Sequence, residues 1–199
     1  MASNKRSRDA SKATGQLRII GGQWRGRKLA FRNSPGLRPT TDRVRETLFN
    51  WLAPDIAGAR CLDLFAGSGA LGLEALSRGA QHCDFNDTNR GALDDIAGHL
   101  QTLSAGDRGQ CTFGGADAFI AATRQPYDLI FVDPPFSSGL AEETLELLAR
   151  SACVNDGSFI YLETGQDDPL PQLPEGWSLY RDKRAGGVSY RLLLVTTMA

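Results

Sequence analysis

The sequence predicts an α/β fold in which helices cover both faces of a mostly parallel β-sheet. Between about residues 60 and 165, short apolar segments typical of strands alternate with segments of helical periodicity. This alternation is typical of βαβ units, which build parallel sheets. A glycine-rich turn after the first of these strands leads into a helix, as in nucleotide-binding α/β domains. The 199 residues, 41% of them hydrophobic, suffice for one domain with a substantial core.

Before this alternation, residues 17–31 predict two short strands joined by glycine-rich turns. A helix is then predicted from about Thr41 to Pro54, because apolar residues recur there on one helical face. These residues are Val44, Leu48, Trp51 and Leu52.

The alternating part contains five predicted strands, at 60–65, 82–86, 111–113, 127–133 and 158–163. Helices are predicted between them, at 70–78, 90–103, 117–123 and 140–150. Residues 177–196 then form two apolar segments around a Gly-Gly turn with no helix between them. One of these last two strands must therefore run antiparallel to the rest.

Charge is distributed unevenly along the chain. The first 50 residues hold 12 Lys and Arg against three acidic residues, net +9, whereas the remainder holds 10 against 20, net −10. Lys and Arg bind nucleic acids by displacing counterions from phosphates, so we expect this N-terminal part to contact a nucleic acid. For residues 1–15 alone, a solvated tail without a partner explains the charge equally well. The candidate nucleic-acid-binding residues are Arg18, Trp24, Arg25, Arg27, Lys28, Arg32 and Arg38, and positive charge continues at Arg43 and Arg45.

Several classes of protein are disfavoured. The four cysteines lie far apart, mostly in apolar segments and without a C-x-x-C pair, which argues against a zinc site and a disulfide framework. No apolar segment approaches the roughly 18 residues of a membrane helix, and no apolar region follows the charged N-terminus. His82 and His99 have no second ligand at metal spacing. We therefore expect a cytoplasmic protein without a metal or a membrane anchor.

The strongest local motif follows the strand that contains Asp63. Gly67, Gly69 and Gly72 form a G-x-G-x-x-G pattern, in which glycines allow a sharp turn and close approach of a ligand to the helix N-terminus. Asp87 follows Gly67 by 20 residues, at the end of the next strand, where a carboxylate can bind both ribose hydroxyls. Alone, Asp87 would equally be a turn residue. Together these features indicate a nucleoside-containing cofactor.

Two features distinguish between the nucleoside cofactors. The Asp63 carboxylate precedes the glycines, where it would repel a pyrophosphate but attract the ammonium group of a methionine moiety. Asp133-Pro134-Pro135-Phe136 ends a later strand. The prolines stiffen this segment, so that the Asp133 carboxylate and the Pro134 carbonyl present two hydrogen-bond acceptors. We expect these acceptors to hold a planar amine while Phe136 stacks on its ring.

These residues carry a family resemblance. DLFAGSGALGLEALSRGA (63–80) and YDLIFVDPPF (127–136) resemble class I S-adenosylmethionine-dependent methyltransferases that act on exocyclic amines. With LRPTTDRVRETLFNWL (37–52), RIIGGQWRGRKL (18–29) and KRAGGVSYRLLLV (183–195), the chain resembles the bacterial ribosomal-RNA small-subunit methyltransferase D family over about residues 17–196. That family methylates N2 of one guanine in small-subunit (16S) rRNA.

The resemblance implies a Rossmann-like class I methyltransferase fold: a seven-stranded, mostly parallel sheet with a C-terminal antiparallel hairpin, preceded by an N-terminal β-hairpin and helix. It implies a disordered basic tail (1–16), an extension that binds RNA and covers the cofactor (17–54) and a catalytic domain (55–199). The expected partner of this monomer is small-subunit rRNA, either free or within an assembling ribosomal particle.

The resemblance also implies which residues bind S-adenosyl-L-methionine. These are Asp63, Phe65, Ala66, Gly67, Ser68, Gly69 and Asp87 for methionine and ribose, Asp117 and Ala118 for adenine, and Thr40, Asp42 and Arg43 over the cofactor or the RNA. The catalytic residues are Asp133, Pro134, Pro135 and Phe136. The family commonly has Glu at the end of the second strand, where this sequence has Asn86 and Asp87.

Plainer interpretations remain open for some of these residues. Asp117 would also suit a helix N-cap, as would Thr40 or Thr41, and Arg43 would suit a solvated surface. The D-P-P-F motif alone also allows adenine N6 or cytosine N4 as the methylated amine. A nicotinamide-dependent oxidoreductase and an RNA-binding module without catalysis are disfavoured by Asp63 and by the intact glycine and D-P-P-F motifs, respectively.

Overall fold

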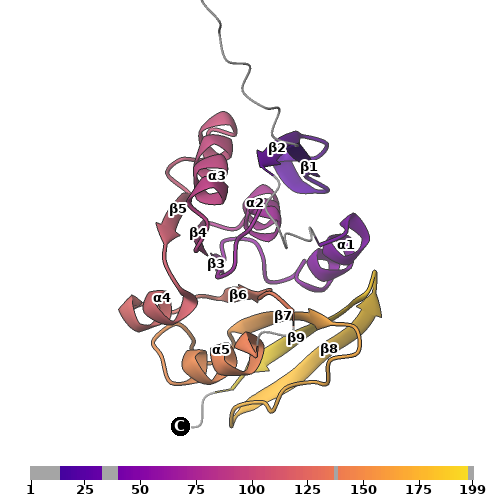
Figure 1. Ribbon diagram of the computed structural model, residues 1–199, viewed down its shortest axis with the longest axis vertical. Coiled ribbons are helices and arrows are strands. Elements are labelled where there is room, and N and C mark those ends of the chain that lie inside the picture. Colours follow the sequence, from indigo (N-terminus) through magenta and orange to yellow (C-terminus); the bar gives the residue numbers. More distant parts are fainter. Residues whose placement is uncertain (1–13, 33–39, 137–138, 197–199) are drawn as a thin grey trace, which may run out of the picture.

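The computed structural model describes residues 14–32, 40–136 and 139–196 (Figure 1). The expected α/β fold is confirmed. An N-terminal two-stranded sheet contains β1 (Thr14–Arg18) and β2 (Lys28–Arg32), with a short 3-10 turn (Gly22–Trp24) between them. The main sheet contains β3 (Arg60–Asp63), β4 (His82–Asp87), β5 (Gly109–Phe113), β6 (Leu129–Val132), β7 (Phe159–Gly165), β8 (Trp177–Ala185) and β9 (Val188–Val195). The α-helices are α1 (Asp42–Trp51), α2 (Ala70–Ser77), α3 (Arg90–Thr102), α4 (Ala116–Ala122) and α5 (Leu140–Ala149).

The main sheet has the strand order β5-β4-β3-β6-β7-β9-β8. Strands β3 to β7 pair in parallel, and β9 is antiparallel to both β7 and β8. This confirms the expected C-terminal hairpin. The strand order reverses beside β3, so the carboxyl ends of β3, β4 and β6 meet at the place where open α/β sheets bind ligands.

Successive residues of each strand point to opposite faces of the sheet, and both faces are apolar. Cys61 of β3 belongs to a core with α1, α2 and α3, whereas the next residue, Leu62, belongs to a second core with α4 and α5. Each face is therefore covered by helices, as a parallel sheet requires. Within the described residues, no helix is long and apolar enough to cross a lipid bilayer.

The N-terminal hairpin packs on α2 and α3. The backbone N–H groups of Ile20 and Gly21 donate to the two carboxylate oxygens of Glu74, each at 2.8 Å. The Ser77 hydroxyl accepts from Trp24 N at 3.0 Å and donates to Gly21 O at 2.6 Å. These bonds fix the extension to the helix that follows the glycine-rich turn.

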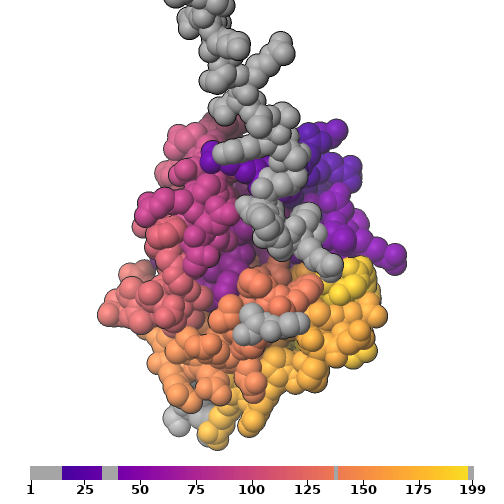
Figure 2. All heavy atoms as spheres, in the orientation of Figure 1, coloured from indigo at the N-terminus to yellow at the C-terminus, as the bar shows by residue number. Residues whose placement is uncertain are grey.

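Helix α1 starts as expected and lies between the hairpin and the start of β9. The Thr41 hydroxyl caps it by accepting from Val44 N at 3.3 Å. At its other end, Trp51 stacks on Tyr190 with ring centroids 5.4 Å apart. In Figure 2 the yellow β8–β9 end lies next to violet α1. The N-terminal extension and the C-terminal hairpin therefore lie next to each other.

Two expectations about the N-terminal part need correction. Residues 14–16, expected in the disordered tail, form the start of β1, while residues 1–13 lie outside the described part. Arg45 is buried against Glu74 and does not continue the basic surface. Trp24 is half-exposed, packs against the core and has the Arg108 guanidinium 5.6 Å from its ring, so RNA binding by Trp24 stays a prediction.

Candidate active site

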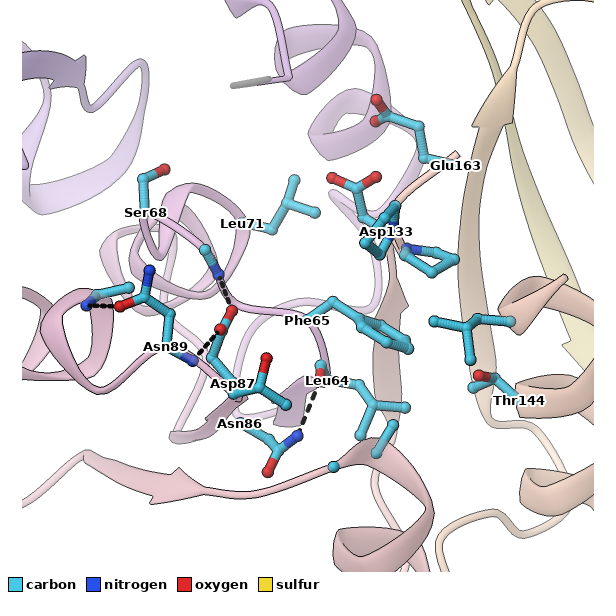
Figure 3. Close-up of a pocket in the computed structure, with 18 of the residues that line it drawn as sticks. Leu64, Phe65, Ser68, Leu71, Asn86, Asp87, Asn89, Asp133, Thr144 and Glu163 are labelled. Atoms are coloured by element: carbon cyan, nitrogen blue, oxygen red, sulfur yellow. Dashed lines mark hydrogen bonds between the residues drawn. The ribbon is translucent and has the colours of Figure 1, made fainter. Parts of the chain in front are cut away.

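A cavity of about 640 Å³ opens at the carboxyl ends of β3, β4 and β6 (Figure 3). Its walls come from the glycine-rich turn, the ends of these strands, the start of α4 and one side of α5. Because parallel strands end at the same edge of a sheet, residues far apart in sequence meet here. The expected site residues that line the cavity are Thr40, Phe65, Gly67, Ser68, Asp87, Asp117, Asp133, Pro134, Pro135 and Phe136.

The glycine-rich turn is held by the carboxylate at the end of β4. Asp87 accepts hydrogen bonds from Gly67 N at 2.8 Å and from Asn89 N at 2.7 Å, one on each oxygen. Both the turn and the start of α3 are therefore aligned by the same side chain. Asp87 also lines the cavity, and each of its carboxylate oxygens can accept a further hydrogen bond.

The backbone of the turn requires glycine at two positions. Gly67 and Gly69 have φ values of 51° and 75°, in the left-handed region. At Gly69 a Cβ atom would also lie 2.8 Å from Cγ1 of Ile96 in α3. The glycine pattern therefore serves the packing of the turn on α3 as well as the approach of a ligand. Gly69 itself does not line the cavity.

Asp63 lies behind the turn rather than in the cavity wall. Its side chain is buried, and Oδ2 accepts from Gly72 N at 2.9 Å. Burial raises the pKa of Asp63 to about 7, the nearby Asp87 charge adds to this rise, and the Gly72 hydrogen bond opposes it. The carboxyl group is therefore partly protonated at neutral pH.

This pKa predicts a pH dependence of stability that depends on Asp63. The folded protein keeps the proton up to about pH 7, whereas the unfolded chain releases it near pH 4. Because the folded state binds more protons in this window, the Asp63 contribution to the free energy of unfolding falls as pH rises from about 4 to about 7. Asp63→Asn lacks this titration, so urea unfolding should show the variant gaining stability relative to the wild type across this range. Equal pH slopes for the two proteins would contradict the raised pKa.

Two carboxyl groups lie together at the other end of the cavity. Asp133 follows β6 and Glu163 lies in β7, and Figure 3 shows both side chains turned toward the same space. Burial holds the pKa of Asp133 well above its usual range, and the charges of Glu163 and then Asp63 raise it further. Burial also raises the pKa of Glu163, against the hydrogen bonds it accepts from Tyr161 and Thr40.

The other expected cofactor residues lie outside the cavity wall. They are Asp63, Ala66, Gly69, Ala118, Asp42 and Arg43. Asp42 is engaged by two arginines, Arg18 at 3.0 Å and Arg45 at 2.7 Å, and Arg43 is exposed. Asp117 is not an N-cap residue: Gly115 occupies that position, and Asp117 lies in the first turn of α4, exposed to the cavity.

The expected RNA-binding residues differ in the exposure and ion pairing of their side chains. Arg25, Arg27 and Lys28 are exposed beside the hairpin turn. Arg18 pairs with Asp42, and Arg32 pairs with Asp95 at 3.1 Å while lining the cavity. Arg38 lies outside the described residues. Because Arg18 and Arg32 each pair with an aspartate, the exposed Arg25, Arg27 and Lys28 beside the hairpin turn are the strongest candidates for RNA contact.

The sequence reasoning missed Glu163 and Asn86. Glu163 is the last residue of the predicted strand 158–163, and this position was a signal, since Asp87 and Asp133 also lie at the ends of predicted parallel strands. Asn86 is buried, and its amide donates to Leu64 O at 3.1 Å and Gly114 O at 3.2 Å. It thereby joins the ends of β3 and β5 across β4, with Asp87 beside it turned to the cavity.

Comparisons with known proteins cover almost the whole described chain. A family model described as "Conserved hypothetical protein 95" matches residues 17–194. The ribosomal RNA small subunit methyltransferase D of Escherichia coli strain K12 is 54% identical over 179 residues, which are 90% of this chain and 90% of that protein. The protein of the same name from Haemophilus influenzae is 46% identical over 183 residues, 90% of this chain and 94% of its own.

The chain belongs to the ribosomal RNA small subunit methyltransferase D family. The resemblance seen in the sequence is thus confirmed. The solved structure of the Escherichia coli protein yhhF superimposes with a TM-score of 0.83 at 49% identity, covering 92% of this chain and 99% of that one. The class I methyltransferase fold expected for the ribosomal RNA small subunit methyltransferase D family is therefore the fold observed here.

Proposed function

We propose that this protein, an S-adenosyl-L-methionine-dependent methyltransferase of ribosomal RNA, methylates the exocyclic N2 amine of one guanine in small-subunit rRNA. The observation that carries the proposal is the position of Asp133 and Pro134. They follow β6 and line the same cavity as Asp87 and the glycine-rich turn. In this proposal one end of the cavity binds the nucleoside and the other end binds the amine.

The residues of the cavity fit S-adenosyl-L-methionine, which supplies the electrophilic methyl group when bound. Asp87 faces the cavity and suits the ribose hydroxyls, and Asp117 at the start of α4 suits the adenine amine. Gly67 and Ser68 bring the turn close to the ligand space, where a side chain of ordinary size at Gly67 would strain the backbone. The buried Asp63 carboxyl sits behind this turn, and a bound cationic methionine moiety would lower its raised pKa and favour its ionised form.

Asp133, Pro134 and Phe136 would hold the base. The amine lone pair of guanine is delocalised into the ring, which makes N2 a poor nucleophile. If Asp133 in its ionised form and the Pro134 carbonyl each accept one N–H, the nitrogen becomes more tetrahedral and its lone pair points along the transfer direction. Orientation of this kind contributes roughly 7 to 11 kcal/mol to lowering a barrier. The amine becomes acidic as the methyl group arrives, and Asp133 or water takes the proton.

The target base must leave its stack to reach this cavity. Extrusion costs least in a single-stranded or loop context, so we propose that the substrate is an accessible nucleotide of small-subunit rRNA, free or in an assembling particle. In this proposal residues 17–54 bind RNA and cover the cofactor, residues 55–199 perform catalysis, and the protein acts as a monomer.

Incubation with unmodified ribosomal RNA and isotopically labelled S-adenosyl-L-methionine tests the proposal. Nucleosides from the digest should contain labelled N2-methylguanosine in small-subunit rRNA and none in large-subunit rRNA. DNA in the same reaction serves as the competing substrate. Labelled N6-methyladenosine or N4-methylcytosine would instead support the alternative that the D-P-P-F motif allows.

The exposed basic residues of the hairpin should bind phosphates. Reversing the charge of Arg25, Arg27 and Lys28 together should weaken RNA binding strongly. It should also flatten the salt dependence, since each single-strand phosphate contact contributes roughly −0.7 to the slope of log affinity against log salt. Binding titrations at several salt concentrations measure both effects.

A control reversal at Arg124 and Arg150, in the α4–α5 region, tests whether net charge alone is responsible. Both residues are exposed and lie far along the chain from the hairpin. This variant should retain most of the RNA affinity and the original slope. If the hairpin variant kept the wild-type slope, the RNA would have to enter along another surface.

A further inference from the structure

Glu163 lies where the methylated base would present its ring edge. Parallel pairing of Val132 with Leu162 brings the next residues, Asp133 and Glu163, to neighbouring positions at the carboxyl ends of β6 and β7. The Glu163 side chain is buried but lines the cavity, and Figure 3 shows its carboxyl group beside that of Asp133. A ring bound through its amine at Asp133 would therefore meet Glu163 next.

The Glu163 carboxylate is held by one of its two oxygens. Oε2 accepts from the Tyr161 hydroxyl at 2.6 Å and from the Thr40 hydroxyl at 3.2 Å. Among the residues that the structure describes, none donates a hydrogen bond to Oε1. Two hydroxyl groups from different parts of the chain thus orient the carboxylate and leave its second oxygen as an acceptor for a ligand.

Guanine offers the hydrogen-bond donor that this acceptor needs. Beside its N2 amine, guanine carries a proton on N1, whereas adenine and cytosine carry an unprotonated ring nitrogen beside their amines. A carboxylate oxygen accepts from N1–H but repels a ring lone pair. A buried polar group left without its partner is costly, and sites built on such a bond discriminate strongly against analogues that lack it.

We infer that Glu163 selects guanine by accepting its N1–H while Asp133 and Pro134 accept the N2 amine. The inference rests on the proposed guanine-N2 activity and adds the residue that determines the choice of base. In this arrangement Tyr161 and Thr40 are positioning residues that act through Glu163.

Glu163→Gln replaces the proposed hydrogen-bond acceptor with a donor and changes the shape of the side chain little. Hydroxyl groups can donate only to the amide oxygen, so the Tyr161 and Thr40 hydroxyls should hold that oxygen in the place of Oε2. The amide NH2 then replaces Oε1 and presents a donor to the ring. Such a donor suits 2-aminopurine, which has the same amine beside an unprotonated N1.

The test compares two substrates that differ only at the target nucleotide. The modified guanosine is first mapped with the wild-type enzyme, and the same rRNA is then assembled with 2-aminopurine at that position. The ratio of kcat/KM for guanine to kcat/KM for 2-aminopurine should be at least about 100 in the wild type. In Glu163→Gln this ratio should fall by at least about tenfold, with affinity for S-adenosylhomocysteine within about threefold of wild type.

Tyr161→Phe is the matched control, because it removes a hydroxyl group from the same carboxylate but keeps the acceptor. It should retain the preference for guanine whatever its effect on the rate. An equal loss of both activities in Glu163→Gln, leaving the ratio unchanged, would overturn the inference and assign Glu163 a structural role.

The wild-type comparison needs no variant and is decisive by itself. If the wild-type enzyme methylated 2-aminopurine as efficiently as guanine, Glu163 would not read N1–H. That result would leave guanine-N2 methylation intact. Absence of N2-methylguanosine with the wild-type enzyme would instead refute the proposed function itself, and the inference with it.

Discussion

Asp133→Ala should reduce methyl transfer by at least about a thousandfold and leave S-adenosylhomocysteine affinity within a few fold. In the proposed mechanism this carboxylate binds the amine, and its side chain lies away from Asp87 and the glycine-rich turn. Removing one preorganised hydrogen-bonding group from a transition state typically costs 10²–10³ in rate, and loss of orientation adds to that cost. Single-turnover assays with rRNA measure the rate, and calorimetry measures cofactor affinity.

Asp107→Ala provides a control for loss of a carboxylate. Asp107 is exposed just before β5, at the opposite end of the strands from the cavity. The Asp107→Ala variant should retain wild-type activity. Comparable rates for Asp133→Ala and the wild type would remove Asp133 from the mechanism, and a large loss of cofactor affinity would place it at the cofactor instead.

Glu74→Ala should cause the largest loss of stability. The Glu74 side chain is fully buried in α2 and accepts from four groups: Ile20 N, Gly21 N, Arg45 and Arg78. Its removal leaves two backbone N–H groups of the hairpin without their acceptor and weakens the pairing of the buried Arg45. Breaking a buried ion pair by removing one partner costs about 3–5 kcal/mol.

Urea unfolding followed by circular dichroism measures this loss. Glu46→Ala, at an exposed position of α1, is the control and should change the free energy of unfolding by no more than about 0.5 kcal/mol. The hairpin should also become accessible to protease in Glu74→Ala, because its anchor on α2 is gone. Unfolding midpoints equal to that of the wild type would show that the hairpin packs without Glu74.

The sequence predicted the features that depend on local rules. Strand and helix segments follow from apolar periodicity, and the glycine turn follows from its need for positive φ at Gly67 and Gly69. That Asp87 and Asp133 line one cavity was also predictable, because each lies at the carboxyl end of a parallel strand and such strands end at one edge.

Contacts between distant segments were not predictable from the sequence. Glu74 lies in the apolar helix 70–77, where a single glutamate is typical of a solvated position, yet all faces of α2 are covered and it binds the hairpin. Arg45 was likewise expected on a basic surface because charged side chains are usually solvated, but it is buried against Glu74. The position of Glu163 beside Asp133 follows from the β6–β7 register, and its hydrogen bond with Thr40 joins segments 123 residues apart.

Nucleoside mass spectrometry of small-subunit rRNA tests the central claim most directly. It should compare cells with and without this protein, and cells that carry only the Asp133→Ala variant. We predict that the rRNA from cells lacking the protein has one N2-methylguanosine fewer per molecule. The wild-type gene should restore this nucleoside, whereas the Asp133→Ala gene should not. An unchanged N2-methylguanosine content, or the loss of a methylated adenosine or cytidine instead, would contradict the assignment of guanine N2 as the target.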